Sequence, residues 1–107
     1  MAEQGSRLLT LAPVEVVTPG TAVQLPTVGQ SSTAKTVFLQ ALSTNEEPVV
    51  IGDEKVKAEV GAHGSGKQRG IELAAKATVS IEVIDSATIW VDARKAKDGV
   101  AVTVLCA

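Results

Sequence analysis

The sequence has 107 residues, a formal net charge of −2, 45% hydrophobic residues and only 2% aromatic residues. This length accommodates one domain with a single core. The negative charge argues against a protein that binds the nucleic-acid backbone, and the shortage of aromatic side chains argues against single-stranded nucleic acid and sugars as ligands. Val, Ala, Leu and Ile supply most of the apolar content, and with many threonines they favour strands over helices.

The cysteine count and the hydropathy pattern set further bounds. One cysteine permits no internal disulfide, so Cys106 is expected to be a small, partly buried side chain in a terminal strand. No segment has the length of a membrane span or the charged-then-apolar start of a signal peptide. We therefore expect a protein made in the cytoplasm, with no membrane partner.

The first apolar segment, residues 7–18, reads RLLTLAPVEVVT and is interrupted by Pro13. Proline cannot donate to a ladder, so this segment predicts an edge strand or two short strands joined at a bend. The same segment is a candidate arm that docks on a neighbouring chain. The chain therefore divides into residues 1–13, an arm or edge strand, and residues 14–107, one sandwich domain.

The middle of the chain alternates short β-type runs with turn-forming residues. The piece 74–77, AAKA, has helical propensity but is too short to form a helix, so it predicts a turn. Short strands are predicted at residues 21–25, 35–43, 49–52, 55–60, 71–74 and 78–84.

The end of the chain carries the strongest local signal. Residues 88–92 and 99–106 are β-branched runs on either side of a polar connection that contains Asp98-Gly99, a pattern typical of a β-hairpin. Both faces of the last run are apolar, so we expect this strand to lie inside a sheet and not at its edge. One of its faces carries Val100, Val102, Val104 and Cys106.

The runs number about eight or nine, they recur at regular spacing, and none shows a helical apolar period. This pattern predicts an all-β fold, an antiparallel β-sandwich of jelly-roll type. We expect no helix longer than about two turns.

The glycine-rich segment 61–68, GAHGSGKQ, matches the first seven positions of the phosphate-binding loop pattern. Gln68 stands where that loop needs a hydroxyl for magnesium, and a strand-like run from Ile71 follows where the loop needs a helix. We therefore interpret the segment as a surface loop, with no nucleotide cofactor, and expect Lys67→Ala to leave folding and nucleotide binding unchanged.

No other group of residues predicts a metal or catalytic site. His63 is the single histidine, and no cysteine or carboxylate stands at ligand spacing from it. The acidic pairs Glu46-Glu47 and Asp53-Glu54 lack the dense oxygen ligands of a calcium loop. The sequence therefore predicts no enzyme activity, no cofactor and no bound metal.

Seven side chains are candidate contacts with a partner. Three leucines beside Pro13 would form an adhesive apolar patch if exposed. The single tryptophan lies on a polar-looking strand face, where it either anchors an interface or covers the core. The basic connection before Asp98 is either a solubilising turn or a contact for an acidic surface. The candidates are Leu8, Leu9, Leu11, Trp90, Arg94, Lys95 and Lys97.

Four fold-forming motifs carry a resemblance to a known family. Between residues 16 and 105 the chain is similar to the small β-sandwich decoration, cement or staple proteins of tailed-bacteriophage capsids. It departs from them at residues 74–77, where such proteins often carry a Pro-Gly turn. The motifs are Gly20-Thr21-Ala22-Val23-Gln24-Leu25, Val49-Val50-Ile51-Gly52, Gly70-Ile71-Glu72-Leu73, and Ile89-Trp90-Val91-Asp92-Ala93 followed by Lys97-Asp98-Gly99-Val100.

This resemblance implies a structural virion protein on the capsid exterior, made in the host cytoplasm, that bridges subunits of the major capsid protein. It implies a homo-oligomer, with a dimer favoured over a trimer, and no enzyme activity. Deletion of residues 1–12 should then leave a soluble sandwich that binds shells poorly. Two alternatives stay open: a structural domain of a phage tail or fibre, and a carbohydrate-binding sandwich module.

Overall fold

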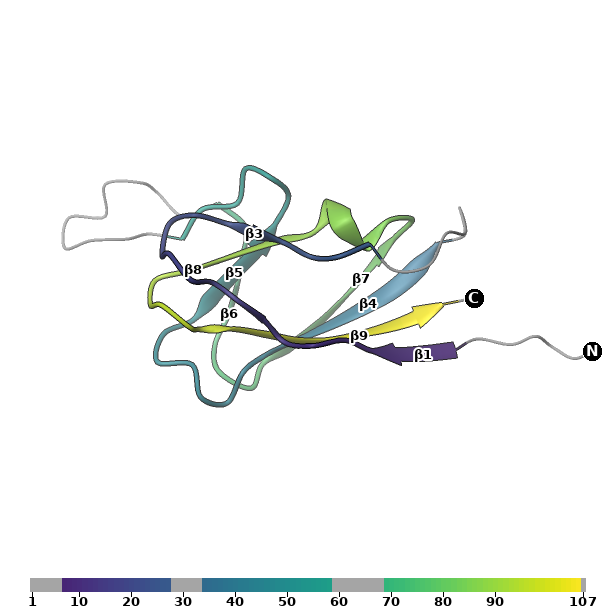
Figure 1. The fold of residues 1–107 in the computed structure, drawn as a ribbon, viewed down its shortest axis with the longest axis horizontal. Coiled ribbons are helices and arrows are strands. Elements are labelled where there is room, and N and C mark those ends of the chain that lie inside the picture. Colours follow the sequence, from purple (N-terminus) through teal and green to yellow (C-terminus); the bar gives the residue numbers. More distant parts are fainter. Residues whose placement is uncertain (1–6, 28–33, 59–68, 107) are drawn as a thin grey trace, which may run out of the picture.

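The computed structural model describes residues 7–27, 34–58 and 69–106. They form two antiparallel sheets packed face to face (Figure 1), which confirms the prediction of an all-β sandwich. Sheet A contains β1 (Arg7–Thr10), β2 (Val14–Glu15), β4 (Lys35–Ala41), β7 (Thr78–Val83) and β9 (Gly99–Cys106). Sheet B contains β3 (Val23–Gln24), β5 (Val49–Gly52), β6 (Ile71–Leu73) and β8 (Trp90–Ala93), and a 3₁₀ turn, η1 (Ser86–Thr88), precedes β8.

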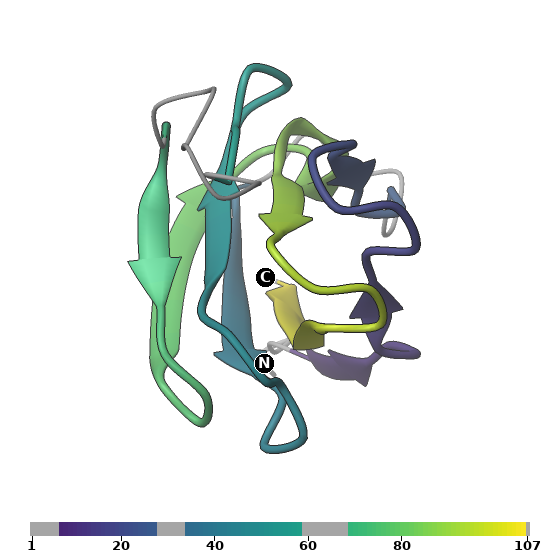
Figure 2. The same ribbon diagram turned by 90° about the vertical axis from the view of Figure 1, so that its left-hand side faces the viewer.

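The strand order is β1-β9-β4-β7 in sheet A, with β2 also paired to β9, and β3-β8-β5-β6 in sheet B. Figure 2 shows β6 and β7 along one side of the sandwich and β3 and β1 along the other. The last strand, β9, has β1 and β2 on one side and β4 on the other, so its predicted place inside a sheet is confirmed.

The predicted hairpin at the end of the chain is wrong, because β8 and β9 belong to different sheets. The connection 94–98 reverses the chain as expected, but it crosses from sheet B to sheet A. The Asp98-Gly99 signal identifies a reversal without specifying whether the two strands pair with each other. Each strand has a buried inner face, and placing the two strands in opposite sheets lets these faces pack against each other.

The main core lies between the sheets and consists of aliphatic side chains. In β9, alternate residues Val100, Val102 and Val104 are at most 1% exposed, as the predicted alternation requires. They share one cluster with inward-facing residues of β4, β5 and β8. Those residues are Val37, Leu39, Ala41, Val49, Ile51, Val91 and Ala93.

A second, smaller cluster covers the outer face of sheet B. Val56 and Ala58 pack on Val50, with Ala22 and Trp90 at the margin. The predicted strand 55–60 is therefore wrong over its described part, which forms one isolated bridge, Lys57 to Arg69, outside the named strands. Its alternation of apolar residues was correctly detected, but those residues lie over a sheet face and do not extend the sheet. The glycine-rich loop 61–68 lies outside the described residues.

Gly70 shows why the chain needs glycine before β6. Its φ is +127°, and a Cβ at this position would lie 2.5 Å from the carbonyl oxygen of Ile51. Any side chain here would therefore collide with β5 and also strain the backbone. The Gly-Ile-Glu-Leu motif thus reflects the close approach of two strands.

The first apolar segment of the chain forms two short strands, β1 and β2, that both pair with β9. Leu8 faces Leu105 and Val14 faces Val100, so β1 and β2 both pair with β9 on either side of Pro13. Between them the amide of Leu11 donates to the carbonyl of Val102 at 3.1 Å. The division of the chain at residue 13 stays a prediction.

Candidate assembly surfaces

The three candidate leucines lie in two different environments. The side chain of Leu8 is 66% exposed, whereas Leu9 and Leu11 are partly buried against the main core. This difference follows from the alternation of β1, which turns Leu8 to the outer face of sheet A and Leu9 inward. Of the three, Leu8 is the side chain most open to a partner.

Trp90 is partly buried in the second cluster and borders an open cleft of about 510 Å³. Two polar side chains of this cleft bond within the chain. Gln24 donates its amide to the carbonyl of Ala87 at 2.7 Å, and the hydroxyl of Thr88 donates to the carbonyl of Asp85 at 2.8 Å. Trp90 thus packs against the second cluster, and the predicted partner contact at Trp90 stays a prediction.

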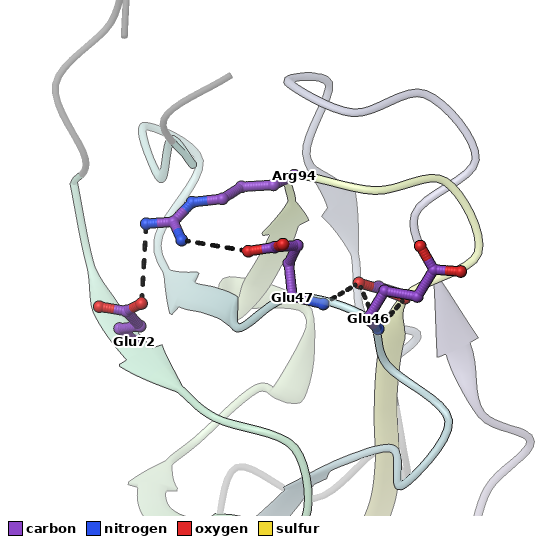
Figure 3. Close-up of polar contacts among 5 residues, drawn as sticks. Glu46, Glu47, Glu72 and Arg94 are labelled. Carbon is purple, nitrogen blue, oxygen red and sulfur yellow. Dashed lines mark hydrogen bonds and ion pairs between the residues drawn. The ribbon is translucent and has the colours of Figure 1, made fainter. Parts of the chain in front are cut away.

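The basic connection 94–97 is held by ion pairs at its first residue, Arg94. The Arg94 guanidinium lies 3.8 Å from the Glu47 carboxylate and 3.6 Å from the Glu72 carboxylate (Figure 3). These partly exposed pairs link the ends of β8 and β6 with the connection before β5. Lys95 and Lys97 are exposed at the tip. The structure therefore places the seven candidates at three separate locations, and their partner contacts stay predictions.

Two buried carboxylates were missed by the sequence analysis, and the first is Asp98, 3% exposed. It accepts hydrogen bonds from the amide of Glu46 at 3.0 and 3.2 Å and from that of Glu47 at 3.0 Å. The neighbouring Asn45 exchanges two bonds of 2.9 Å with the backbone of Gly99. Together these bonds join connections 42–48 and 94–98, which both pass between the sheets.

The second buried carboxylate is Asp92, which is fully buried under the second cluster. It accepts from the amides of Gly20 at 3.0 Å, Ala58 at 2.8 Å and Ala93 at 2.8 Å. A buried carboxylate needs such donors, and here they attach the turn before β3 and the segment 53–58 to β8. In the alternation of β8, Asp92 points away from the main core. The sequence gave no sign that another segment covers this side of the strand.

The outer face of sheet A carries few charges. Strand alternation places twelve described side chains on it, and Glu15 and Glu82 are the charged ones among them. The face is formed by Leu8, Thr10, Glu15, Thr36, Phe38, Gln40, Thr78, Ser80, Glu82, Ala101, Thr103 and Leu105. Protein surfaces that meet only water usually carry more charge than this.

The edge strands of the sandwich differ in how they are protected. β3 has two residues with Pro26 close behind, β6 has three residues after Gly70, and β1 ends at the bend around Pro13. In contrast, β7 is a six-residue run, TVSIEV, without proline, glycine or lysine. Among the described strands it pairs only with β4. Long, regular edges of this kind are templates for pairing with another chain.

Neither a metal site nor a spanning helix is found in the described ranges. No group of three or more His, Cys, Asp or Glu side chains there is placed to hold a metal ion. The same residues contain no helix long and apolar enough to cross a membrane.

The described strands define a two-sheet antiparallel β-sandwich. No protein-family model matches the chain, and no curated protein is similar to it in sequence. Among solved structures, it is similar to a chain from the disulfide-linked pili of Bacillus endospore appendages. The TM-score is 0.54 at 14% identity, and the match covers 97% of this chain and 88% of the other. At this identity the similarity shows a shared fold.

These comparisons correct the sequence-based assignment. The similarity found is to a pilus chain, so the assignment to phage capsid decoration proteins is wrong, as are the virion location and the major capsid protein as partner. The physical reason is that the quoted motifs are fold-forming: Gly70 permits close strand approach, and Asp98-Gly99 anchors a crossing. Such features recur in unrelated sandwiches. The predicted sandwich fold agrees with this similarity.

Proposed function

We propose that the protein is a structural subunit that assembles with copies of itself into a filament. The observation that carries this proposal is the sparsely charged outer face of sheet A, which spans β1, β2, β9, β4 and β7. Charged residues are depleted in the centres of protein interfaces. The similarity to a pilus chain shows that this fold occurs in a filament.

The single cysteine limits how such a filament is held together. A continuous disulfide-linked polymer needs at least two thiols in each subunit, because every internal subunit has two neighbours. These 107 residues contain one, Cys106, which can join two copies at most. The proposed filament is therefore held by non-covalent contacts along its length, with at most pairwise disulfides.

Assembly is tested on the purified wild-type protein over a range of concentrations, with and without reductant. Light scattering should rise with concentration, and negative-stain microscopy should show filaments that survive reductant. A protein that stays monomeric up to its solubility limit would contradict the proposal.

A matched pair of lysine substitutions tests the face itself. Thr103→Lys puts a charge at the centre of the face, whereas Ala75→Lys puts the same charge in the exposed turn 75–76 at the edge of the sandwich. The first should suppress filaments and the second should not. Equal behaviour of the two variants would show that the face is not buried in the filament.

A further inference from the structure

We infer that two copies of the chain pair through their β7 strands, antiparallel and centred on Ser80. This inference rests on the proposed self-assembly and identifies its first contact. It follows from three properties of β7: which backbone groups it leaves open, which side chains would face each other, and where its charge lies.

The hydrogen bonds show which backbone groups of β7 are open. The amide of Ala41 donates to the carbonyl of Ala77 at 2.9 Å, and the amide of Leu42 donates to that of Gly99 at 3.0 Å. Antiparallel ladders alternate, so β4 uses its odd-numbered residues toward β7 and its even-numbered ones toward β9. Accordingly Thr78, Ser80 and Glu82 turn their amides and carbonyls away from β4.

One register uses all three open residues. With Ser80 opposite Ser80 of the second copy, Thr78 lies opposite Glu82, and each facing pair exchanges two backbone hydrogen bonds. A register shifted to centre on Ile81 would pair only Ser80 with Glu82 within β7 and would place Thr78 opposite Ile84, beyond the end of the strand. The Ser80-centred register therefore gives the largest number of bonds for this strand.

The side chains agree with the same register. On the inner face, partly buried Val79 meets Ile81 of the second copy, so the main core continues across the contact. On the outer face, Glu82 meets Thr78 and not a second Glu82, which avoids repulsion between like charges. The pair leaves the β1 edge of each copy open at the two outer ends, where the second contact needed for a filament can form.

Cysteine substitutions test the register directly, in a Cys106→Ser background. In a hydrogen-bonded antiparallel pair the facing Cα atoms lie about 5.5 Å apart, within reach of a disulfide. Ser80→Cys should therefore cross-link into dimers under mild oxidation. Thr78→Cys is the matched control on the same edge and face, since its two copies would lie about 13 Å apart along the strands. Equal cross-linking of both variants would overturn the register.

Lysine substitutions at the same two positions test the charges. Ser80→Lys places two lysines opposite each other and should weaken the dimer, measured by sedimentation equilibrium, about tenfold or more. Thr78→Lys places each lysine opposite Glu82 and should tighten it about threefold to tenfold at low salt. Both positions are exposed, so circular dichroism should show folded protein in each case. Weakening by both variants would contradict the inference.

The combined outcomes separate this contact from the proposed function. Wild-type filaments whose formation is insensitive to Ser80→Lys, with no Ser80→Cys cross-link, would overturn the β7 contact and leave the filament proposal standing. Register-specific dimers without filaments would support the contact and contradict the filament. A wild-type protein that neither dimerises nor polymerises would overturn both.

Discussion

At the scale of single residues, the fold depends on polar groups that the hydrophobic pattern does not reveal. Asp98 is buried and satisfies the amides of Glu46 and Glu47 at a point where two connections cross between the sheets. Hydrogen bonds to a charged acceptor contribute more than neutral ones, and removing the acceptor leaves donors without a partner. This one side chain therefore contributes to holding the two sheets in register at that end.

We predict that Asp98→Ala lowers the free energy of unfolding by about 2–4 kcal/mol. Asp98→Asn keeps the size and one oxygen acceptor, so it should cost roughly half as much. Urea denaturation of both variants measures the difference. Equal stability of Asp98→Ala and the wild type would show that the two connections do not depend on this carboxylate.

Gly99 is required for a steric reason. A Cβ on Gly99 would lie 2.0 Å from the carbonyl oxygen of Val14 and 2.8 Å from the Cα of Glu15, both of which are backbone atoms that cannot move aside cheaply. We predict that Gly99→Ala costs about 2–3 kcal/mol and loosens β2. Thermal unfolding, combined with hydrogen exchange of residues 14–16, measures both effects. Unchanged protection in β2 would contradict this account.

At the scale of elements, β1 offers a direct test of strand alternation. Leu8 is exposed on the outer face, and its neighbour Leu9 packs against the main core. We predict that Leu9→Ala lowers stability by about 1–3 kcal/mol, whereas Leu8→Ala changes it by less than about 0.5 kcal/mol. Urea denaturation of the two variants compares them. The opposite order would show that β1 pairs in a register shifted by one residue.

Local patterns predicted most strands well, because each strand's alternation is contained in its own residues. The runs 49–52 and 99–106 coincide with β5 and β9, and the predicted 78–84 differs from β7 by one residue. What local patterns lack is the identity of the neighbouring strand. The 55–60 run was therefore assigned to a sheet although Val56 and Ala58 cover one, and the last two strands were expected to pair.

The candidate surfaces were predicted less well than the strands, and the reason is again non-local. Exposed apolar and basic residues were identified one at a time, yet Leu9 is turned inward and Arg94 is paired with two glutamates. The sparsely charged outer face of sheet A draws residues from five strands between Leu8 and Leu105. It becomes visible only after the strand order is known.

At the scale of the whole molecule, the two sides of the sandwich are unequal. One long side ends in β3 and in β1 and β2, which are short or interrupted by proline. The other side carries β7, the longest regular edge among the described strands, which also borders the sparsely charged outer face of sheet A. This asymmetry supports self-association that begins at one edge and places the remaining surfaces for further growth.

Hydrogen exchange on the assembled and the monomeric protein tests this account most directly. In the monomer the amides of Thr78, Ser80 and Glu82 should exchange rapidly, while those of Val79 and Ile81, bonded to β4, are protected and serve as internal controls. On assembly all three open amides should become protected to a similar degree as their neighbours. If assembled protein kept rapid exchange at these three amides while protection rose elsewhere, β7 would not be the assembly edge and the account would be wrong.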